Sequence, residues 1–333
     1  MSATNLATSG KRWAIGVVPG VLRTPSVGPV FALGLAMAFF SVKSGQFLRG
    51  PNLSLVFQQV IEVGVLAIGQ TLVILTAGID LSCGAVMAFG MIVMTKLAVL
   101  SGVPAIPAIL LGIAACAGFG LLNGVLITRI RLPAFIVTLG TLNIAMALVH
   151  IYSNEQTIEN PPSAMLFFGR TFTIGGTDIT YGVVLMLALF ALAWFVLTQT
   201  AWGSRIYAVG NNPEATRLSG IRTDRLLVSV YVAAGVIYGI AALLLVARTQ
   251  VGDPNAGQTD NLDSITAVVI GGTSLFGGRG NVIGTLIGAL IVGVFRNGLV
   301  LIGVSSVYQI LITGILVILA VSVDQFTHRK ERG

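Results

Sequence analysis

Long apolar stretches alternate with short polar breaks along the chain, from about residue 28 to residue 323. A helix needs about 20 apolar residues to cross a bilayer core about 30 Å thick, and most of these stretches have that length. We therefore predict an all-α polytopic membrane protein with about ten transmembrane or re-entrant helices. The predicted helices span residues 28–42, 54–77, 82–101, 105–128, 133–152, 181–199, 226–248, 264–276, 281–302 and 306–323.

One predicted helix, 264–276, is too short to cross the bilayer at 1.5 Å per residue, so it must be re-entrant, broken or buried. The remaining pattern predicts one permease-like domain over residues 28–323, which includes a polar segment at 200–225. Residues 1–27 and 324–333 form the predicted tails. We expect the N-terminal tail to be retained, because no convincing signal-peptide cleavage site follows it.

Composition supports lipid as the main solvent. Hydrophobic residues make up 55% of the chain and charged residues only 9%, whereas a soluble protein carries about 25% charged residues. The 41 glycines have no triplet period and fit close helix packing in a membrane. Two pairs spaced by four residues, Gly120 with Gly124 and Gly284 with Gly288, are predicted packing faces. These features exclude a cytosolic enzyme and a disulfide-stabilised secreted domain.

The basic residues predict the orientation. If the N-terminus is cytoplasmic and ten segments alternate, 13 of the 19 lysines and arginines lie on the cytoplasmic side. The predicted outer segments 153–180 and 249–263 carry more acidic than basic residues. We therefore expect both termini to be cytoplasmic, and we interpret the net charge of +7 as a topology signal rather than a nucleic-acid surface.

Polar residues inside apolar segments are candidates for function, because burying them in lipid is costly. Gln59, Glu62 and Gln70 share one face of the 54–77 helix at 100° per residue. This stripe either holds helices in register or lines a solute path. Asp80 and Ser82 follow at a glycine-containing break, where capping of the next helix would explain both.

Scattered hydrogen-bonding groups in other segments extend the set of candidates. The candidate translocation path comprises Gln59, Glu62, Gln70, Asp80, Asn123, Thr141 and Asn143. A second glycine-interrupted stretch, IGGTSLFGGRGNVIGTLIG, echoes the break near Asp80 and suggests inverted repeats, although a pair of tight turns would also account for it.

The polar segment 200–225 contains a predicted surface helix. Asn212 has the features of an N-cap, Pro213 of a first helical residue and Glu214 of a first-turn acid. The helix should continue through Arg217 and Leu218 to Ser219 and stop at Gly220. Its mixed charges favour a docking site for a cytosolic protein over a contact with bare anionic lipid.

No catalytic or metal-binding constellation is evident. Cys83 and Cys116 lie in apolar stretches and are predicted small core residues, whereas His150 and His328 are isolated. The chain has no phosphate-binding G-x-x-x-x-G-K-[ST] loop. We therefore expect no metal, no cofactor and no enzymatic activity in this chain.

Four motifs in order resemble the permease subunits of bacterial ABC importers of the ribose, xylose, arabinose and galactoside type. They are GQTLVILTAGIDLSCGAVMAFG (69–90), NGVLITRIRLPAFIVTLGTL (123–142), YAVGNNPEATRLSGI (207–221) and ITAVVIGGTSLFGGRGNVIGTLIGALIVG (265–293). The resemblance covers about residues 28–325. Its Gly78–Ser82 element resembles sugar permeases rather than the related branched-chain amino acid permeases.

This resemblance implies a type II-like importer permease in the bacterial inner membrane. Its implied partners are cytosolic ABC ATPase subunits that bind the ATP, a periplasmic or lipid-anchored sugar-binding protein, and a second permease copy in a homodimer or heterodimer. Residues 211–221 then resemble the coupling helix that sits on the ATPase. The alternative from the residues alone is an ion- or proton-coupled secondary carrier, which would also use broken helices.

Overall fold

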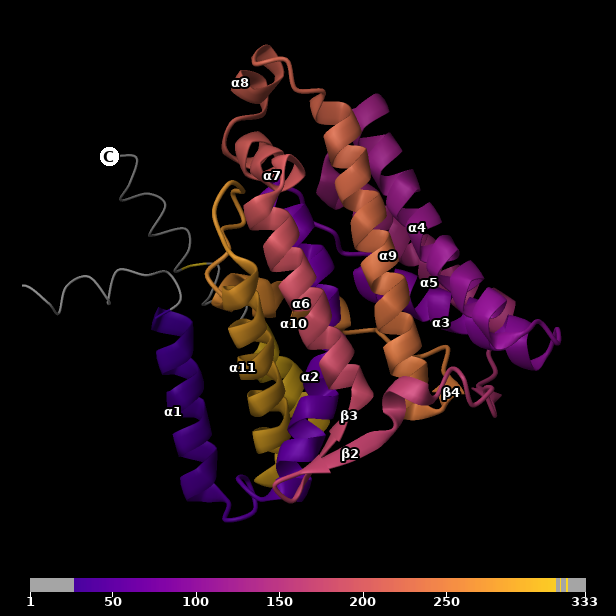
Figure 1. Cartoon of the computed structure of the whole chain (residues 1–333), viewed down its shortest axis with the longest axis vertical. Helices are drawn as coiled ribbons and strands as arrows, with labels where there is room; N and C mark the ends of the chain where they lie inside the picture. The colour runs from indigo at the N-terminus through magenta and orange to yellow at the C-terminus, as the bar shows by residue number, and fades with distance from the viewer. Residues whose placement is uncertain (1–26, 316–317, 319–321, 323–333) are drawn as a thin grey trace, which may run out of the picture.

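The computed structural model describes residues 27–315, 318 and 322. Two long helices, α2 (Gly50–Leu75) and α9 (Thr223–Thr249), form its centre (Figure 1). The most apolar window of α2 is 89% buried and that of α9 is 72% buried, whereas the windows of the outer helices α4, α5 and α6 are only 28% buried. The central helices are thus shielded by protein, and the outer ones expose apolar side chains as lipid requires.

The other elements surround this pair. The helices are α1 (Val27–Lys43), α3 (Cys83–Val99), α4 (Ala105–Arg129), α5 (Ala134–Ser153), the 3-10 helix η2 (Phe167–Gly169), α6 (Tyr181–Gln199), α7 (Ala201–Asn211), α8 (Pro213–Leu218), α10 (Asp260–Ile270) and α11 (Val282–Leu301). Within the described residues, α2, α4, α5, α6, α9 and α11 are long and apolar enough to cross a membrane. A shorter apolar helix covers Ser306–Ile315. The rest of the predicted 306–323 helix falls largely outside the described residues, as do almost all of the two predicted tails and His328.

Most predicted segments reappear as helices with ends moved by a few residues, so the polytopic helical class is confirmed. Two boundaries differ for physical reasons. Helix α2 begins at Gly50 rather than residue 54 because Pro51 starts it well. Helix α10 covers 260–270 rather than 264–276, because acidic residues occupy its first turn and the chain reverses at Gly272, which has φ +88°.

Glycines bring the helices of the core into close contact. A Cβ on Gly120 of α4 would lie 2.2 Å from the carbonyl oxygen of Tyr231 on α9. A Cβ on Gly288 of α11 would lie 1.9 Å from the carbonyl oxygen of Ala267 on α10. The predicted packing role of both glycine pairs is therefore confirmed, because only a residue without a side chain permits these approaches.

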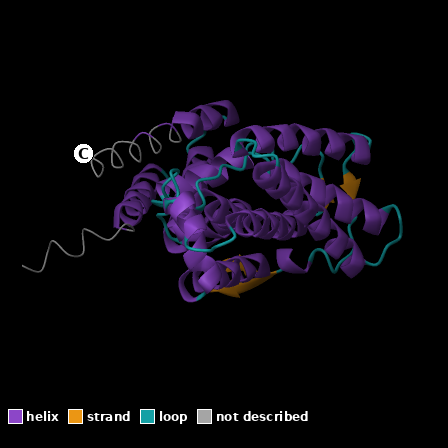
Figure 2. Cartoon of the chain, turned by 90° about the horizontal axis from the view of Figure 1, so that it is seen from above, coloured by secondary structure: helices purple, strands orange, loops and turns teal. Residues whose placement is uncertain are grey.

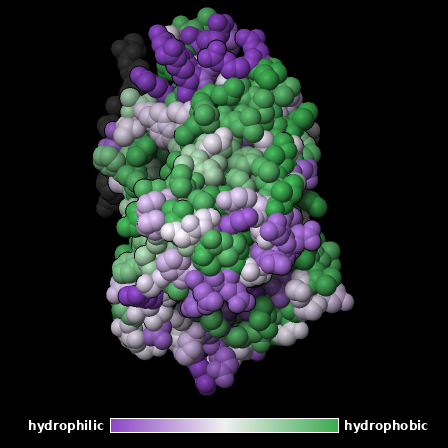
Figure 3. Space-filling view, turned by 90° about the vertical axis from the view of Figure 1, so that its right-hand side faces the viewer, coloured by the Kyte–Doolittle hydropathy of each residue, from purple (hydrophilic) through white to green (hydrophobic). Residues whose placement is uncertain are grey.

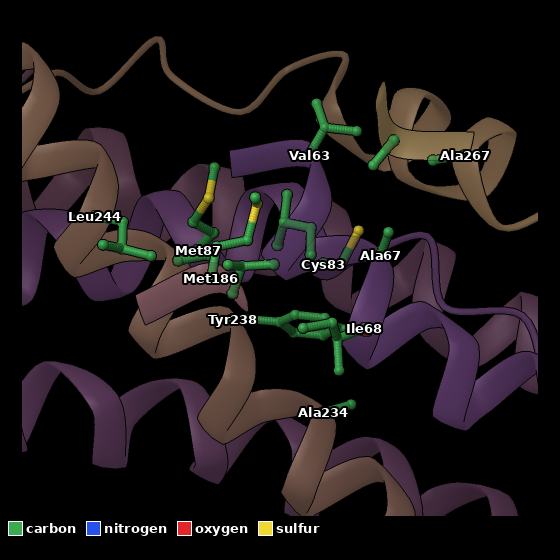
Figure 4. Close-up of a cluster of buried hydrophobic side chains, with 14 of the residues drawn as sticks. Val63, Ala67, Ile68, Cys83, Met87, Met186, Ala234, Tyr238, Leu244 and Ala267 are labelled. Atoms are coloured by element: carbon green, nitrogen blue, oxygen red, sulfur yellow. The ribbon is translucent and has the colours of Figure 1, made fainter. Parts of the chain in front are cut away.

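The core draws side chains from several helices. Figure 4 shows Ile68 of α2, Met87 of α3, Met186 of α6 and Tyr238 of α9 meeting in one apolar cluster. Cys83 lies in the same cluster, and Cys83 and Cys116 are both fully buried free thiols, as predicted.

Short strands, which the hydrophobic pattern did not predict, lie at the end of the molecule opposite α8 (Figure 1). Strands β2 (Thr171–Ile174) and β3 (Thr177–Thr180) form a hairpin, and β1 (Ile158–Glu159) pairs with β4 (Val251–Gly252). Seen from above, both are small patches at the margin of the helices (Figure 2). The hairpin packs on the start of α2, where Ser54 donates a hydrogen bond to the carbonyl of Asp178.

Helix α7 is a second addition. The sequence predicts one short helix in the polar segment, but α7 precedes it and begins where Thr200 accepts a hydrogen bond from the Gly203 amide at 3.2 Å. We refer to α7 and α8 together as the α7–α8 element.

Candidate functional site

A cavity of about 450 Å³ lies at the strand end, between α2, α9, α10 and α11. Glu62 of α2 reaches it and pairs with Arg248 of α9, with Nε to Oε1 at 2.6 Å. The Glu62 side chain is almost fully buried, whereas that of Arg248 is 35% exposed. Glu62 is therefore enclosed by the surrounding side chains, whereas Arg248 is accessible from the cavity.

Much of the rest of the lining is also polar. Asp260 is buried at the cavity wall, and Arg296 of α11 also lines the cavity. The Arg296 guanidinium lies 3.7 Å from the carboxylate of the buried Asp263. The loop after α9 adds Asn255 and Gln258. The lining carries three carboxylates, those of Glu62, Asp253 and Asp260, and two guanidinium groups, those of Arg248 and Arg296, so the cavity offers hydrogen-bond acceptors and donors side by side. Such a lining suits an uncharged solute with several hydroxyl groups.

Sequence reasoning placed Glu62 in a candidate path but left out Arg248, Asp260 and Arg296. The sequence did contain a signal for Arg296, because an arginine inside the apolar 281–302 stretch must find a partner or water. Gln59 lies one turn before Glu62 and is half-buried, and its Oε1 atom has no hydrogen-bond partner among the described residues.

Three other predicted path residues, Gln70, Asp80 and Asn123, lie elsewhere, in a buried network centred on Asp80. The Gln70 side chain donates to the main-chain carbonyl of Asp80 and to the Cys83 sulfur at 3.0 Å. The Asp80 carboxylate accepts from the Ser82 amide at 2.8 Å and from the Ser82 hydroxyl at 2.6 Å. Both of these bonds to the Asp80 carboxylate thus come from Ser82, the residue before α3, and Ser82 makes no side-chain capping bond to that helix; the expected capping of α3 by these side chains is not seen.

Helices distant in sequence close this network. Asn123 of α4 donates to the Ser82 hydroxyl at 3.1 Å, and Tyr238 of α9 donates to the Asp80 carboxylate at 3.2 Å. Asp80 is 2% exposed and Asn123 1%. Their hydrogen bonds hold the break after α2 against α3, α4 and α9, and so fix the position of these helices.

The last two path candidates lie on α5. Thr141 is buried and donates to the carbonyl of Thr138 at 3.2 Å. Asn143 is exposed, and its amide donates to the carbonyl of Leu139 on its own helix at 3.0 Å. The structure thus places Glu62 at the cavity, three candidates in the Asp80 network and two on α5, while Gln59 lies on α2 outside the cavity lining.

Helix α8 has the local structure that its sequence predicts. The Asn212 side chain accepts from the Ala215 amide at 2.9 Å, and Pro213 opens the helix. Arg217 forms a two-bond ion pair with Glu214, the shorter bond being 2.6 Å, and this hydrogen-bonded partner lowers the pKa of the Glu214 carboxyl. Gly220 follows the helix with φ +87°. The confirmed helix projects from the end opposite the short strands (Figure 1).

The surface of α8 is suited to docking. Leu218 is 75% exposed at its end, and the Glu214 and Arg217 side chains are both more than 60% exposed. The helix thus offers one apolar side chain and a charged pair on its accessible surface.

The α7–α8 element is tightly connected to both glycine-containing breaks. The Gly278 amide donates to the carbonyl of Leu75, the last residue of α2, at 2.9 Å. Gly210 of α7 fits against the same two residues, since a Cβ there would lie 1.8 Å from the Leu75 oxygen and 2.5 Å from the Gly278 nitrogen. Tyr207 donates to the Gly280 carbonyl at 3.0 Å. A movement of α7 must therefore move the end of α2 and the loop between α10 and α11.

Among the described residues, no group of three His, Cys, Asp or Glu side chains could hold a metal ion. The acidic residues near the cavity are opposed by arginines instead. This arrangement can bind and orient a polar solute, but it contains no nucleophile paired with a base.

Comparison with known proteins agrees with this geometry. The chain is 44% identical over 312 residues to the fructose import permease protein of Rhizobium meliloti, covering 92% of this chain and 87% of the relative. It is 39% identical over 301 residues to the ribose import permease protein of Bacillus subtilis, covering 90% and 92%. It is 33% identical over 300 residues to the D-allose transport system permease protein of Escherichia coli, covering 90% and 91%. No solved structure matches the chain.

A family model described as the permease component of the branched-chain amino acid transport system matches residues 52–321. This range includes the cavity helices, the Asp80 network and the α7–α8 element. The match extends over most of the chain, and the relatives named above agree with it in being permeases. The chain therefore belongs to this family of transport-system permease components.

Proposed function

We propose that this chain is the transmembrane permease subunit of an ATP-driven ABC importer that carries a monosaccharide across the bacterial inner membrane. The observation that carries the proposal is its similarity, over about nine-tenths of its length, to permeases named for fructose, ribose and allose. The relatives give no support to a secondary carrier.

The cavity supports a sugar-like solute. Glu62 and Asp260 supply hydrogen-bond acceptors and Arg248 and Arg296 supply donors, the two kinds of partner that sugar hydroxyl groups use. The lining has one more carboxylate than guanidinium groups, which disfavours an anionic solute because like charges would be brought together. The cavity opens at the strand end, which in this proposal is the periplasmic side where a binding protein delivers the sugar.

The α7–α8 element supports coupling to a cytosolic ATPase. Its exposed helix projects from the opposite end, and its base is joined to Leu75 and to the loop at Gly278. Closure of two ATPase subunits would shift α8 and thereby the two breaks, as a rigid-body movement. In this proposal ATP is hydrolysed by the partner, both termini are cytoplasmic, and a second permease copy completes the pathway.

Transport by proteoliposomes tests the proposal. The permease is reconstituted with the ATPase and the binding protein of its transporter, and uptake of labelled ribose, fructose and allose is measured with ATP inside or outside. We expect uptake of at least one sugar only when ATP is on the ATPase side. Uptake that persists without ATP but is abolished by an uncoupler would overturn the proposal in favour of a secondary carrier.

Docking has its own test. The double variant Glu214→Lys/Arg217→Glu keeps an ion pair on α8 but inverts its charge pattern. We expect it to lose co-purification with the ATPase while the permease remains folded in the membrane. Co-purification at the wild-type ratio would show that α8 is not the coupling helix.

A further inference from the structure

A second, larger groove of about 930 Å³ lies at the α8 end, between the C-terminus of α4 and the N-terminus of α9. Five arginines line it, together with a single acidic residue, Asp224. The arginines are Arg129, Arg131, Arg217, Arg222 and Arg225. Only Arg217 at its edge belongs to the docking helix proposed above; the rest of the groove has no role in the proposed transport mechanism.

Four of the five arginines have no acidic partner. Arg217 is satisfied by Glu214 at 2.6 Å, but no ion pair joins the other four arginines to any acid in the described part of the chain. All four are exposed, so their guanidinium groups are free to bind. Asp224 offsets one of these charges, and the groove keeps a clear excess of positive charge. Arginines in this arrangement are suited to bind phosphate through two parallel N–H···O bonds.

The floor of the groove is apolar. Val125 of α4 is 38% exposed there, and Val228, Val232 and Ala233 of α9 are half-buried beside it. In Figure 3 a hydrophilic cap at the α8 end adjoins a hydrophobic band directly below it. A ligand in the groove thus meets guanidinium groups at one end and aliphatic side chains at the other.

The loop between α4 and α5 has the chemistry of a membrane interface. Ile130 is 60% exposed and Leu132 is 40% exposed on either side of Arg131. Arg131 itself has φ +60°, a left-handed conformation that costs a non-glycine residue about 1–2 kcal/mol. Apolar side chains alternating with a basic one fit the boundary between acyl chains and headgroups.

We propose that this groove binds the phosphate headgroup of an anionic phospholipid, with its acyl chains along the valine floor. A free phosphate ion would use the arginines but not the apolar floor, and a soluble protein surface would not need the floor to continue into the hydrophobic band. Basic pockets between transmembrane helices bind such headgroups in other membrane proteins. This proposal goes beyond sugar transport, and it does not depend on which side of the membrane the α8 end faces.

Native mass spectrometry of the full-length permease in non-ionic detergent tests the site. Phosphatidylglycerol and phosphatidylcholine are titrated in parallel onto the wild type and onto Arg129→Gln/Arg225→Gln. The charge-matched control is Lys43→Gln/Arg205→Gln, which removes two exposed basic residues outside the groove. Near-surface arginines contribute about 1 kcal/mol each to anionic lipid binding, so we expect the groove variant to bind phosphatidylglycerol about 30-fold more weakly.

The outcomes separate the possible occupants. The control should bind like the wild type, and phosphatidylcholine should bind weakly to all three proteins. Equal phosphatidylglycerol binding by the groove variant would overturn the proposal. Displacement of the lipid by millimolar inorganic phosphate would assign the groove to a free anion, and displacement by the ATPase subunit would assign it to protein docking; both results contradict the lipid assignment. None of these readouts depends on sugar transport, so failure here leaves the proposed function untouched.

Discussion

The contact of Gly210 with the end of α2 gives the sharpest prediction. The change is Gly210→Ala, which adds one methyl group in the last turn of α7. On helix propensity alone this change stabilises a helix by about 0.5–1 kcal/mol, because glycine loses more backbone entropy on folding. The tertiary structure predicts instead that Gly210→Ala lowers the stability of the protein.

The magnitude follows from the geometry. The new Cβ would lie 1.8 Å from the Leu75 oxygen, whereas ordinary van der Waals contact begins at 3.4 Å. Leu75 and Gly278 present main-chain atoms at this place, so no side chain can rotate away and α7 itself must move. Such overpacking costs about 1–3 kcal/mol. We therefore expect the unfolding temperature to fall by about 2–10 °C.

Two assays separate stability from coupling. Thermal unfolding of the purified permease reports the first, and sugar-stimulated ATP hydrolysis by the reconstituted transporter reports the second. Gly118→Ala is the matched control, because Gly118 is also inside a helix and has nothing within 4 Å of a built Cβ. If Gly210→Ala unfolds at or above the control temperature with wild-type stimulation, the proposed link between α7 and α2 is wrong.

Three further predictions follow from other contacts. Glu62→Gln should destabilise the fold by about 1.5 kcal/mol, because Arg248 loses a charged hydrogen-bond partner but keeps its 35% exposure to the cavity. The double variant with Arg248→Gln should recover much of this loss in thermal unfolding, and additive losses would show that the two residues are not coupled. Asn212→Ala should destabilise α8 by about 0.5–2 kcal/mol, because the helix loses its N-cap. The loss should appear as faster hydrogen exchange at residues 213–218, and unchanged exchange would refute the capping role. Arg217 lowers the pKa of Glu214, so their ion pair stabilises α8 fully above the ordinary pKa of 4.5, and this stabilisation is lost as the pH falls through the lowered value. Hydrogen exchange of α8 should therefore rise in that pH range in the wild type. The same pH profile in Glu214→Gln would contradict this cause.

Much of the fold could be predicted from the sequence because its signals are local. Apolar runs of helix length mark the spans, and the cap at Asn212 with Gly220 after the helix end defines α8 within nine residues of chain. Glycine spacing correctly predicted close packing for α4, although it could not name α9 as the partner. The helix α7 was missed because its polar and apolar residues form no long apolar run. The suggested inverted repeats remain a prediction.

The candidate site was less predictable, because its residues are brought together over long distances in the chain. Glu62 and Gln70 share a helix and a polar stripe, yet Glu62 pairs with Arg248, 186 positions later, and Gln70 holds the break at Asp80. A helical period shows which side chains share a face, but not which neighbour covers each turn of it.

The sequence by itself determined that this chain belongs in a membrane, where its helices run, and that a capped helix lies between two of them. These properties depend on the composition and on interactions between residues a few positions apart. Only the tertiary structure decided that Glu62 faces a cavity while Asp80 is enclosed by protein, and that Gly210 joins α7 to both breaks. These properties depend on how helices dock, and docking is governed by shape and charge complementarity between surfaces that the linear order does not place together.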